Sequence, residues 1–163
     1  MELFSADRAV GLTIEPGTIR AVTVERNHGS IVVGVPVHAD VAALPGDEGY
    51  PDALTDAVNK LFDDNNLQRN HVVVALSSAD AVLRKITLPF CDDARIRQTI
   101  KFEIEEVVPF SIEECVVDFH VGRVFEGKSD VLVAAVAKER ISEALAVLDL
   151  CGIDTVAVEL DVA

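Results

Sequence analysis

The sequence predicts an α/β fold in two parts, a mixed sheet with helices followed by a second α/β unit. Three observations lead to this prediction. The first third of the chain alternates apolar and polar residues, as half-buried strands do, and the rest alternates strand-like runs with amphipathic helical segments. Half of the 163 residues are hydrophobic (50%), which is enough to bury a large core and argues against a disordered chain.

The first part, residues 8–80, is expected to begin with a meander of strands. These strands are predicted at residues 9–14, 18–26 and 30–37. Short turns separate them, and Gly29 stands where a positive φ is expected. A helix follows over residues 52–67, with Asp52 as its expected N-cap. The continuous apolar run at residues 71–78 is typical of a strand that is buried on both faces.

The second part, residues 81–163, has a different order of elements. Strands are predicted at residues 81–89, 115–127, 130–137 and 153–161, and helices at residues 92–109 and 138–152. The first helix is expected to be capped by Asp92 or Asp93 and to be closed by Pro109, and the second is expected to end at Gly152. This β-α-β-β-α-β order predicts a ferredoxin-like unit with a split βαβ motif.

The charge balance limits the kinds of partner. The chain has 28 acidic and 14 basic side chains and a formal net charge of −14 at pH 7, so it repels nucleic-acid backbones and anionic lipid headgroups. No run reaches the roughly 18 apolar residues of a membrane-spanning helix, and the N-terminus lacks the pattern of a secretory signal. The three cysteines, Cys91, Cys115 and Cys151, are widely spaced, which indicates reduced thiols and predicts neither a disulfide frame nor a metal site.

A group of carboxylates in the second part is the obvious place to look for acid-base catalysis. Its members are Glu103, Glu105, Glu106, Glu113 and Glu114. A catalytic carboxylate needs an apolar pocket that raises its pKa, whereas acids on an amphipathic helix and its exit loop are typical of a solvated face. The chain also has neither a nucleophile elbow nor a Walker or dinucleotide phosphate loop. We therefore expect no catalytic residue.

An ordered series of short motifs runs through nearly the whole chain. Its members are Gly11-Leu12-Thr13-Ile14 with Ile19-Arg20-Ala21-Val22, Leu88-Pro89, Val108-Pro109-Phe110-Ser111-Ile112-Glu113-Glu114, Asp118-Phe119, Ala134-Ala135-Val136-Ala137-Lys138-Glu139, Cys151-Gly152-Ile153 and Val158-Glu159-Leu160-Asp161. In this order the motifs resemble the N-terminal lobe of the PilM family, the actin-like cytoplasmic proteins of the type IV pilus inner-membrane platform. They resemble, more distantly, the cytoplasmic domain of GspL from type II secretion.

The resemblance implies a fold, a location and a partner. It implies an actin-like, ribonuclease-H-like subdomain (1A-type) over residues 8–80 and an inserted 1C-type subdomain over residues 81–163, with the second lobe of the actin-like fold absent from this chain. It also implies a cytoplasmic protein that is peripheral to the inner membrane through a protein partner. That partner is the cytoplasmic tail of a bitopic membrane protein like PilN. Capture of such a tail uses apolar pockets and strand edges, and an acidic surface suits a tail that bears Lys or Arg.

The same resemblance makes the turn after the first strand a candidate nucleotide site. In the family, an Asp on the first strand helps to hold the metal, and a Gly-Ser/Thr-rich turn offers N–H groups to the phosphates. Here Thr13 replaces that Asp, Glu15 adds a negative charge, and Pro16 removes a donor N–H. Gly17 and Thr18 keep part of the turn. We therefore expect Thr13, Gly17 and Thr18 to form a degenerate phosphate hairpin without ATPase activity.

Three functions remain open at this point. The first is a non-catalytic scaffold subunit of a pilus or secretion platform, which needs no cofactor or metal. The second is an ATP-binding actin-like protein of which this chain is one lobe, with ATP and Mg²⁺ bound only in a longer, two-lobed form. The third is an α/β interaction module unrelated to pili. We favour the scaffold because the hairpin lacks an acidic metal ligand.

Overall fold

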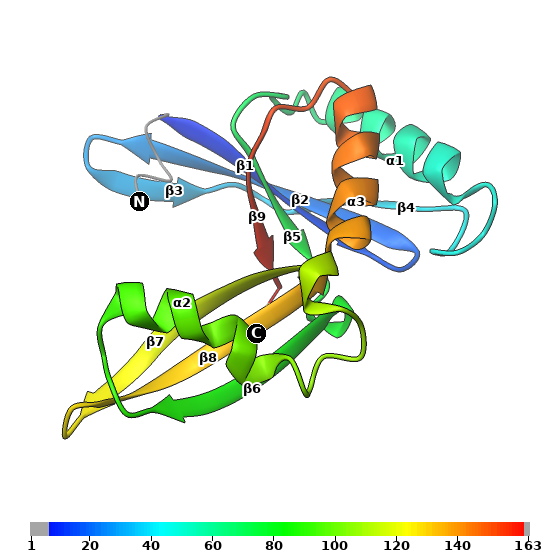
Figure 1. Ribbon diagram of the computed structural model, residues 1–163. Coiled ribbons are helices and arrows are strands. Elements are labelled where there is room, and N and C mark those ends of the chain that lie inside the picture. The colour runs from blue at the N-terminus through cyan, green and yellow to red at the C-terminus, as the bar shows by residue number, and fades with distance from the viewer. Residues whose placement is uncertain (1–6, 162–163) are drawn as a thin grey trace. The chain divides into compact units, whose positions relative to one another are not determined.

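The computed structural model describes residues 7–161, which fold into two compact units (Figure 1). Of these residues, unit 1 contains those up to Ser77 and those from Glu143 onward, and unit 2 contains Ser78–Ser142. In chain order, unit 2 is thus inserted into unit 1. Among residues 7–161, none of the helices is long and apolar enough to span a bilayer.

Unit 1 is built on a mixed six-stranded sheet. Its strands are β1 (Arg8–Glu15), β2 (Thr18–Asn27), β3 (Ser30–Val33), β4 (Val37–Asp40), β5 (Val72–Leu76) and β9 (Thr155–Leu160). The strand order is β3-β2-β1-β5-β9, and β4 also pairs with β2. β2 is antiparallel to β1, β3 and β4, whereas β5 is parallel to β1 and β9. The predicted α/β class and mixed sheet are therefore confirmed.

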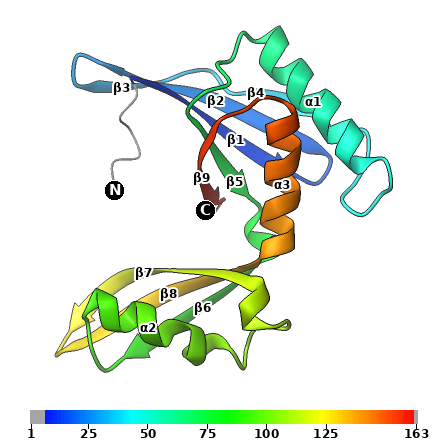
Figure 2. The same cartoon turned by 45° about the horizontal axis from the view of Figure 1, so that its top comes forward.

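Two helices, α1 (Tyr50–Asp64) and α3 (Lys138–Leu150), lie on the same side of this sheet (Figures 1 and 2). The end of α3 approaches α1, where the Cys151 thiol donates to the Thr55 carbonyl at 3.8 Å. The core of unit 1 comes from one stripe of α1, from the buried face of α3 and from alternate residues of the strands. Its largest fully buried side chains are Phe62, Leu12, Ile19, Leu54, Leu61, Leu76, Leu148, Val10, Val58 and Val72.

Helix α1 begins two positions before the predicted start. Its N-cap is Gly49, and the predicted cap Asp52 lies in the first turn. Pro51 explains the difference, because a proline is well accommodated in the first turn, where its missing N–H has no partner to lose. Asp52 still contributes there, since a carboxylate near a helix N-terminus interacts favourably with the helix dipole.

The strand predicted at residues 30–37 is interrupted in the structure. Its first four residues form β3, whereas Val37 is the first residue of β4, and the two strands pair with different stretches of β2. Pro36 lacks the N–H that a continuous ladder needs. Gly34 lies so close to β2 that a Cβ on it would stand 2.2 Å from the Thr23 Oγ1 atom. The interruption therefore comes from local features that apolar periodicity does not reveal.

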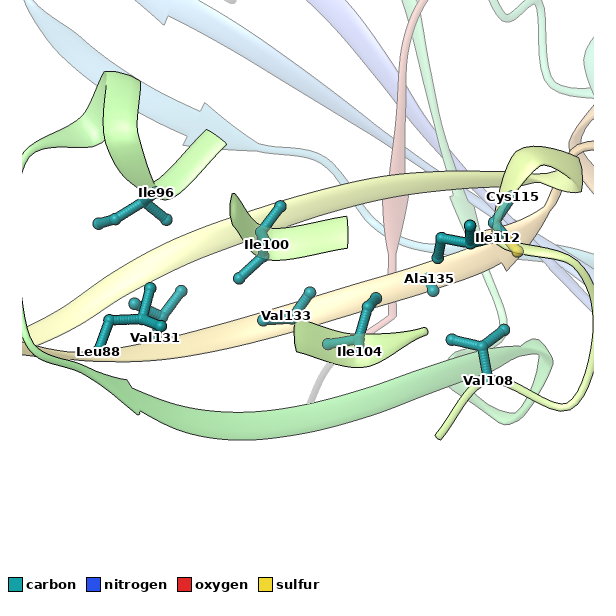
Figure 3. Close-up of a cluster of buried hydrophobic side chains, with 10 residues drawn as sticks. All are labelled: Leu88, Ile96, Ile100, Ile104, Val108, Ile112, Cys115, Val131, Val133 and Ala135. Carbon is teal, nitrogen blue, oxygen red and sulfur yellow. The ribbon is translucent and has the colours of Figure 1, made fainter. Parts of the chain in front are cut away.

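Unit 2 has a three-stranded antiparallel sheet and one helix. The strands are β6 (Ala81–Leu88), β7 (Cys115–Phe125) and β8 (Lys128–Ala137), in the order β6-β8-β7, and the helix is α2 (Asp93–Ile104). Short 3-10 turns, η1 (Ser78–Asp80) and η2 (Ile112–Glu114), precede β6 and β7. The apolar cluster between α2 and the sheet consists of Leu88, Ile96, Ile100, Ile104, Val108, Ile112, Cys115, Val131, Val133 and Ala135 (Figure 3).

Helix α2 has the predicted start and an earlier end. The Asp92 carboxylate accepts a hydrogen bond from the Arg95 N–H at 2.9 Å, so Asp92 is the N-cap. The helix ends at Ile104 and does not extend to Pro109. The reason is a tight turn, in which the Val108 N–H bonds to the Ile104 carbonyl at 3.2 Å and the buried Val108 side chain joins the core.

The last strand does not complete a ferredoxin-like sheet in the second part. The order of elements is as predicted, but β9 pairs with β5 of unit 1, with Val158 opposite Val74. Parallel strands require a long crossover connection, and here unit 2 and α3 together form the crossover from β5 to β9. The compact unit expected over residues 81–163 therefore ends at Ser142, and the segment from Glu143 onward belongs with the unit expected over residues 8–80.

Candidate functional site

The hairpin between β1 and β2 is the first candidate site. Glu15 pairs with Thr18 across the turn formed by Pro16 and Gly17. Gly17 has a φ of +80°, and a Pro followed by a Gly with such a φ is typical of a type II turn. Only Gly adopts this φ at low cost, so the backbone conformation by itself accounts for this residue.

Two hydrogen bonds connect this turn to β4 and the loop after it. The Thr18 hydroxyl donates to the Ala39 carbonyl at 3.2 Å, and the Val41 N–H donates to the Gly17 carbonyl at 3.0 Å. The Leu44 side chain also lies near the turn, 3.7 Å from the position that a Cβ on Gly17 would take. The Thr18 hydroxyl therefore already has a partner within the fold, and donation to a phosphate would require it to leave that partner.

Thr13 lies on the face of the unit 1 sheet opposite the buried Leu12 and Ile14, because successive strand residues point to opposite faces. Its cross-strand neighbours are Arg20 on β2 and Ala75 on β5. The Arg20 guanidinium forms an ion pair with the Glu15 carboxylate. The cation beside Thr13 is therefore already neutralised within the hairpin.

The structure brings the three predicted site residues, Thr13, Gly17 and Thr18, to one end of this hairpin. The structure also places Glu159 of β9 near this site. Glu159 pairs with Ala75 of β5, and Ala75 pairs with Thr13. Thr13 and Glu159 therefore share one face of the sheet, separated by two strand spacings or about 10 Å. Sequence reasoning missed Glu159 because the pairing of β5 with β9 spans the whole inserted unit.

The carboxylates considered for catalysis do not converge on a pocket. All five, Glu103, Glu105, Glu106, Glu113 and Glu114, are exposed. Among residues 7–161, no group of three or more His, Cys, Asp or Glu side chains is placed to hold a metal ion. These acids therefore form a solvated face on α2 and the segment after it.

A pocket in unit 1 lies at the C-terminal end of α3. It is lined by Leu145, Asp149, Gly152, Ile153, Asp154 and Thr155. Thr155 is the first residue of β9, whereas Glu159 lies near the other end of that strand. The pocket is therefore separate from the β1–β2 hairpin.

The cysteines differ in exposure. Cys115 and Cys151 are buried, and burial raises the pKa of both thiols. A raised pKa leaves little reactive thiolate at neutral pH, so these two residues are core thiols. Cys91 is exposed.

The second candidate site is the face of the unit 2 sheet opposite α2. Val131, Val133 and Ala135 of β8 point toward α2 (Figure 3), so Leu132 between them points to the opposite face. Val116 of β7 points to that same face, because its cross-strand partner on β8 is an even-numbered residue like Leu132. Leu132 and Val116 are 42% and 46% exposed.

Polar groups lie beside Leu132 on this face. The Lys85 ammonium contacts the Asp130 carboxylate at 3.2 Å, and the Thr87 hydroxyl donates to the same carboxylate at 2.7 Å. The hydrogen bond from Thr87, followed by the one from Lys85, lowers the pKa of Asp130. His120 lies directly across from Leu132. An apolar centre with fixed polar groups around it has the composition of a protein-contact surface.

Comparison with known proteins identifies the family. Residues 11–163 match the family model described as type IV pilus assembly protein PilM. No curated protein sequence matches the chain. A solved structure described as the PilM-PilN type IV pilus biogenesis complex aligns with 93% of this chain and 47% of its own chain, with 28% identity and a TM-score of 0.78.

Two further solved structures align over most of the chain. The cytoplasmic domain of EpsL, an inner-membrane component of the type II secretion system of Vibrio cholerae, has 15% identity and a TM-score of 0.61 over 93% of this chain and 57% of its own. A Bacteroides thetaiotaomicron protein with an actin-like ATPase fold has 9% identity and a TM-score of 0.48 over 95% of this chain and 52% of its own. The chain thus spans about half the length of these structures. On the strength of the family match, the chain belongs to the PilM family of type IV pilus assembly proteins.

Proposed function

We propose that this chain is a non-catalytic scaffold of a type IV pilus inner-membrane platform and that it binds the cytoplasmic tail of a bitopic membrane protein. The family match over residues 11–163 carries the proposal. The similarity to PilM in a PilM-PilN complex supports a PilN-like protein as the partner. A protein with this role is peripheral to the inner membrane, on its cytoplasmic side.

The state of the β1–β2 hairpin favours a scaffold over an ATPase. Magnesium prefers carboxylate and phosphate oxygens, and Thr13 offers it only a hydroxyl. The Arg20 side chain, which could otherwise contact a phosphate, is paired with Glu15. The Thr18 hydroxyl is bonded to the Ala39 carbonyl. The strands of the hairpin are therefore part of the sheet, and its polar side chains are bonded to other groups of the same unit.

We assign the tail to the face of the unit 2 sheet opposite α2. Leu132 and Val116 supply apolar contacts there, and the Lys85–Asp130 pair with Thr87 supplies fixed polar groups that can set the register of a peptide. The net charge of −14 raises the rate of encounter with a tail that carries Lys or Arg. Affinity then comes from the apolar contacts and the main-chain groups of the peptide.

The test is calorimetric titration with a synthetic peptide that has the sequence of the cytoplasmic tail of a PilN-like protein from the same organism. Leu132→Lys places a charge in the centre of the proposed surface, and we expect it to weaken binding about tenfold or more, which corresponds to about 1.4 kcal/mol. Phe102→Lys is the matched control, because Phe102 is 75% exposed on α2, and we expect it to bind like the wild type.

Each outcome of this titration bears on a different part of the proposal. Absence of binding by folded wild-type protein would argue against the scaffold function. Binding that Leu132→Lys leaves unchanged would keep the function and reject the assigned surface.

A second function, nucleotide binding without turnover, would use Gly17 and Thr18, which keep part of the family's turn. It requires a longer form of the protein that includes a second lobe. Titration of that form with ATP and Mg²⁺ is the test, and a flat titration rejects nucleotide binding. If heat is observed, Thr13→Asp should tighten the Mg²⁺-dependent part of binding, because it restores an anionic metal partner.

A further inference from the structure

A run of exposed apolar residues lies within β3 and the connection after it. Ile31, Val32, Val33 and Val35 are 71%, 49%, 62% and 86% exposed. No residue of the segment 30–37 is charged, although 26% of the whole chain is. Exposed edge strands in proteins usually carry charges that discourage pairing with another chain, and this strand has none. The run is therefore placed to pair with another strand.

The outer edge of β3 has no neighbour in the part of the chain that the structure describes. β3 ends the strand order of the unit 1 sheet, and it pairs there with β2 alone. Ile31 and Val33 point to one face of the sheet, next to Arg26 and Val24 of β2. Val32 points to the other face. Apolar side chains are thus available on both faces of this edge.

The backbone groups of β3 alternate in direction. Ser30 is opposite Asn27 in the pair that closes the β2–β3 hairpin, so its N–H and C=O face β2. Gly34, just after the strand, also donates its N–H to β2, at 2.8 Å. Alternate residues of an antiparallel strand face the same neighbour. The N–H and C=O groups of Ile31 and Val33 therefore face outward, where a further strand can bond to them.

We propose that a second copy of the chain occupies this edge, with the two β3 strands antiparallel about a twofold axis at Val32. In this register Ile31 of one copy lies opposite Val33 of the other, and their outward N–H and C=O groups bond to each other. Val32 lies opposite Val32 of the second copy. The three central cross-strand pairs are then apolar, with Ser30 opposite Gly34 at either end. The contact is also self-complementary, as a twofold dimer requires. The two unit 1 sheets continue into one another.

Charge favours a second copy at this edge. Two chains of net charge −14 repel each other over most of their surfaces, so they associate best where charges are distant. The acid on β2 beside this axis is Glu25, which is opposite Val32 and is paired with Arg8 at 3.0 Å. The Glu25 side chains of the two copies are three strand spacings apart, about 14 Å, which exceeds the Debye length of about 8 Å at physiological salt. A charged peptide would gain no ionic contact from the uncharged β3 itself.

Analytical ultracentrifugation of the chain over a wide range of concentrations tests the proposal. We expect the weight-average mass to rise from 17.5 kDa toward twice that value as concentration increases. The rise should be steeper in high NaCl than in low NaCl, because salt screens the repulsion between two acidic chains. A mass that stays at that of one chain under all conditions overturns the proposal and leaves the edge to a strand of a different protein.

Two variants at the edge locate the contact. Val33→Pro removes an outward N–H and no bond to β2, a position where an edge strand tolerates proline. Ile31→Lys places a charge in the interface at a residue that is already exposed. We expect both variants to sediment as single chains. Val124→Lys is the matched control, because Val124 is 56% exposed on β7 of unit 2, and it should dimerise like the wild type.

Circular dichroism and urea unfolding show whether each variant is folded. If one edge variant fails to fold, the other still decides the question. Wild-type dimerisation strength in both folded edge variants would overturn the proposal, because the contact would then lie elsewhere on the chain.

Discussion

At the scale of single residues, the absence of a side chain at Gly34 allows the chain to pass close to β2. The Gly34 N–H bonds to the Thr23 carbonyl at 2.8 Å, and a Cβ on Gly34 would stand 2.2 Å from the Thr23 Oγ1 atom. Thr is β-branched, so its χ1 has few alternatives that move this oxygen away. A methyl group at residue 34 must therefore displace either the Thr23 side chain or the backbone.

We expect Gly34→Ala to lower the free energy of unfolding by about 1–3 kcal/mol, the usual cost of overpacking. In a background that carries Thr23→Ala, which lacks the oxygen, the same substitution should cost clearly less. Urea unfolding of the wild type, both single variants and the double variant measures this coupling. Additive effects would show that the Thr23 hydroxyl is not the obstacle.

The cysteines make a second prediction at this scale. In native protein at pH 7.5, iodoacetamide should modify Cys91 quickly, whereas Cys115 and Cys151 should react only after unfolding, because burial raises their pKa values and blocks access. Mass spectrometry of labelled peptides with and without urea distinguishes the three residues. Equal labelling of all three in native protein would contradict the buried positions of Cys115 and Cys151.

The candidate hairpin shows what a sequence motif leaves out at this scale. Thr13, Gly17 and Thr18 were located correctly on two strands and a turn, because turn residues and alternation are local properties. The partners of the hairpin were not predicted. The Ala39 carbonyl that accepts from Thr18 lies on β4, and Glu159 lies on the final strand, so both depend on tertiary pairing.

At the scale of elements, helix α2 is held to the unit 2 sheet by one apolar stripe. Ile100 is 2% exposed within the core cluster, and Phe102 on the outer face of the same helix is 75% exposed. We expect Ile100→Ala to lower the free energy of unfolding by about 2–5 kcal/mol, the usual cost of truncating a buried Ile. Phe102→Ala should change it by less than about 0.5 kcal/mol.

Urea unfolding followed by circular dichroism measures both variants of α2. They lie on one helix and differ mainly in burial, so each controls for the effect of alanine on helix propensity. Similar costs for the two substitutions would mean that α2 is not packed on the sheet by this stripe.

The interaction between β6 and β8 makes a prediction about pH. The Thr87 hydroxyl and the Lys85 ammonium lower the pKa of Asp130 in the folded state. A depressed folded-state pKa stabilises the protein above the unfolded pKa of about 3.9, and this stabilisation is lost as the pH falls through the folded value. The wild type should therefore be more stable than Asp130→Asn at pH 7, and the difference should shrink toward pH 3.

Unfolding by urea at several pH values between 3 and 7 checks this dependence. Lys128→Gln serves as a control, since Lys128 carries a charge at the start of the same strand and changes no group that contacts Asp130. A difference between wild type and Asp130→Asn that stays constant over this range would contradict the assigned cause.

Elements with a strong local signal were predicted closely, and those that depend on neighbours were not. The helix over Asp93–Ile104 and its Asp92 cap follow from periodicity and capping chemistry. The early end of α2 follows from the packing of Val108, and the Gly49 cap of α1 follows from the position of Pro51 in the first turn. The division of the strand at residues 30–37 follows from Pro36 and from the close approach of Gly34 to β2. A periodic pattern indicates which face is buried, but it does not show where the chain must turn to bury it.

At the scale of the whole molecule, the excess of acidic side chains acts on stability. A net charge of −14 disfavours the compact state through self-repulsion, and salt screens that repulsion. We expect the urea midpoint of the single-chain variant Val33→Pro to rise when NaCl is increased from 50 to 500 mM. Sodium chloride has only a weak effect on apolar burial compared with sulfate, so a parallel series in sodium sulfate separates the two effects. A midpoint that falls with NaCl would mean that specific ion pairs outweigh the net repulsion.

The sequence alone determined the α/β class and the succession of helices and strands, because turn residues, caps and apolar periodicity act over a few residues. It also determined the family, because the ordered motifs extend over nearly the whole chain. Only the tertiary structure decided that β9 pairs with β5, that the inserted unit ends at Ser142, and that β3 is an exposed edge. The physical reason is that strand pairing joins residues far apart in the chain. The hydrogen bonds of such a pair are made by backbone groups, which are the same in every residue except proline. The residue pattern of a strand therefore indicates which of its faces is buried, but it does not indicate which strand pairs with it.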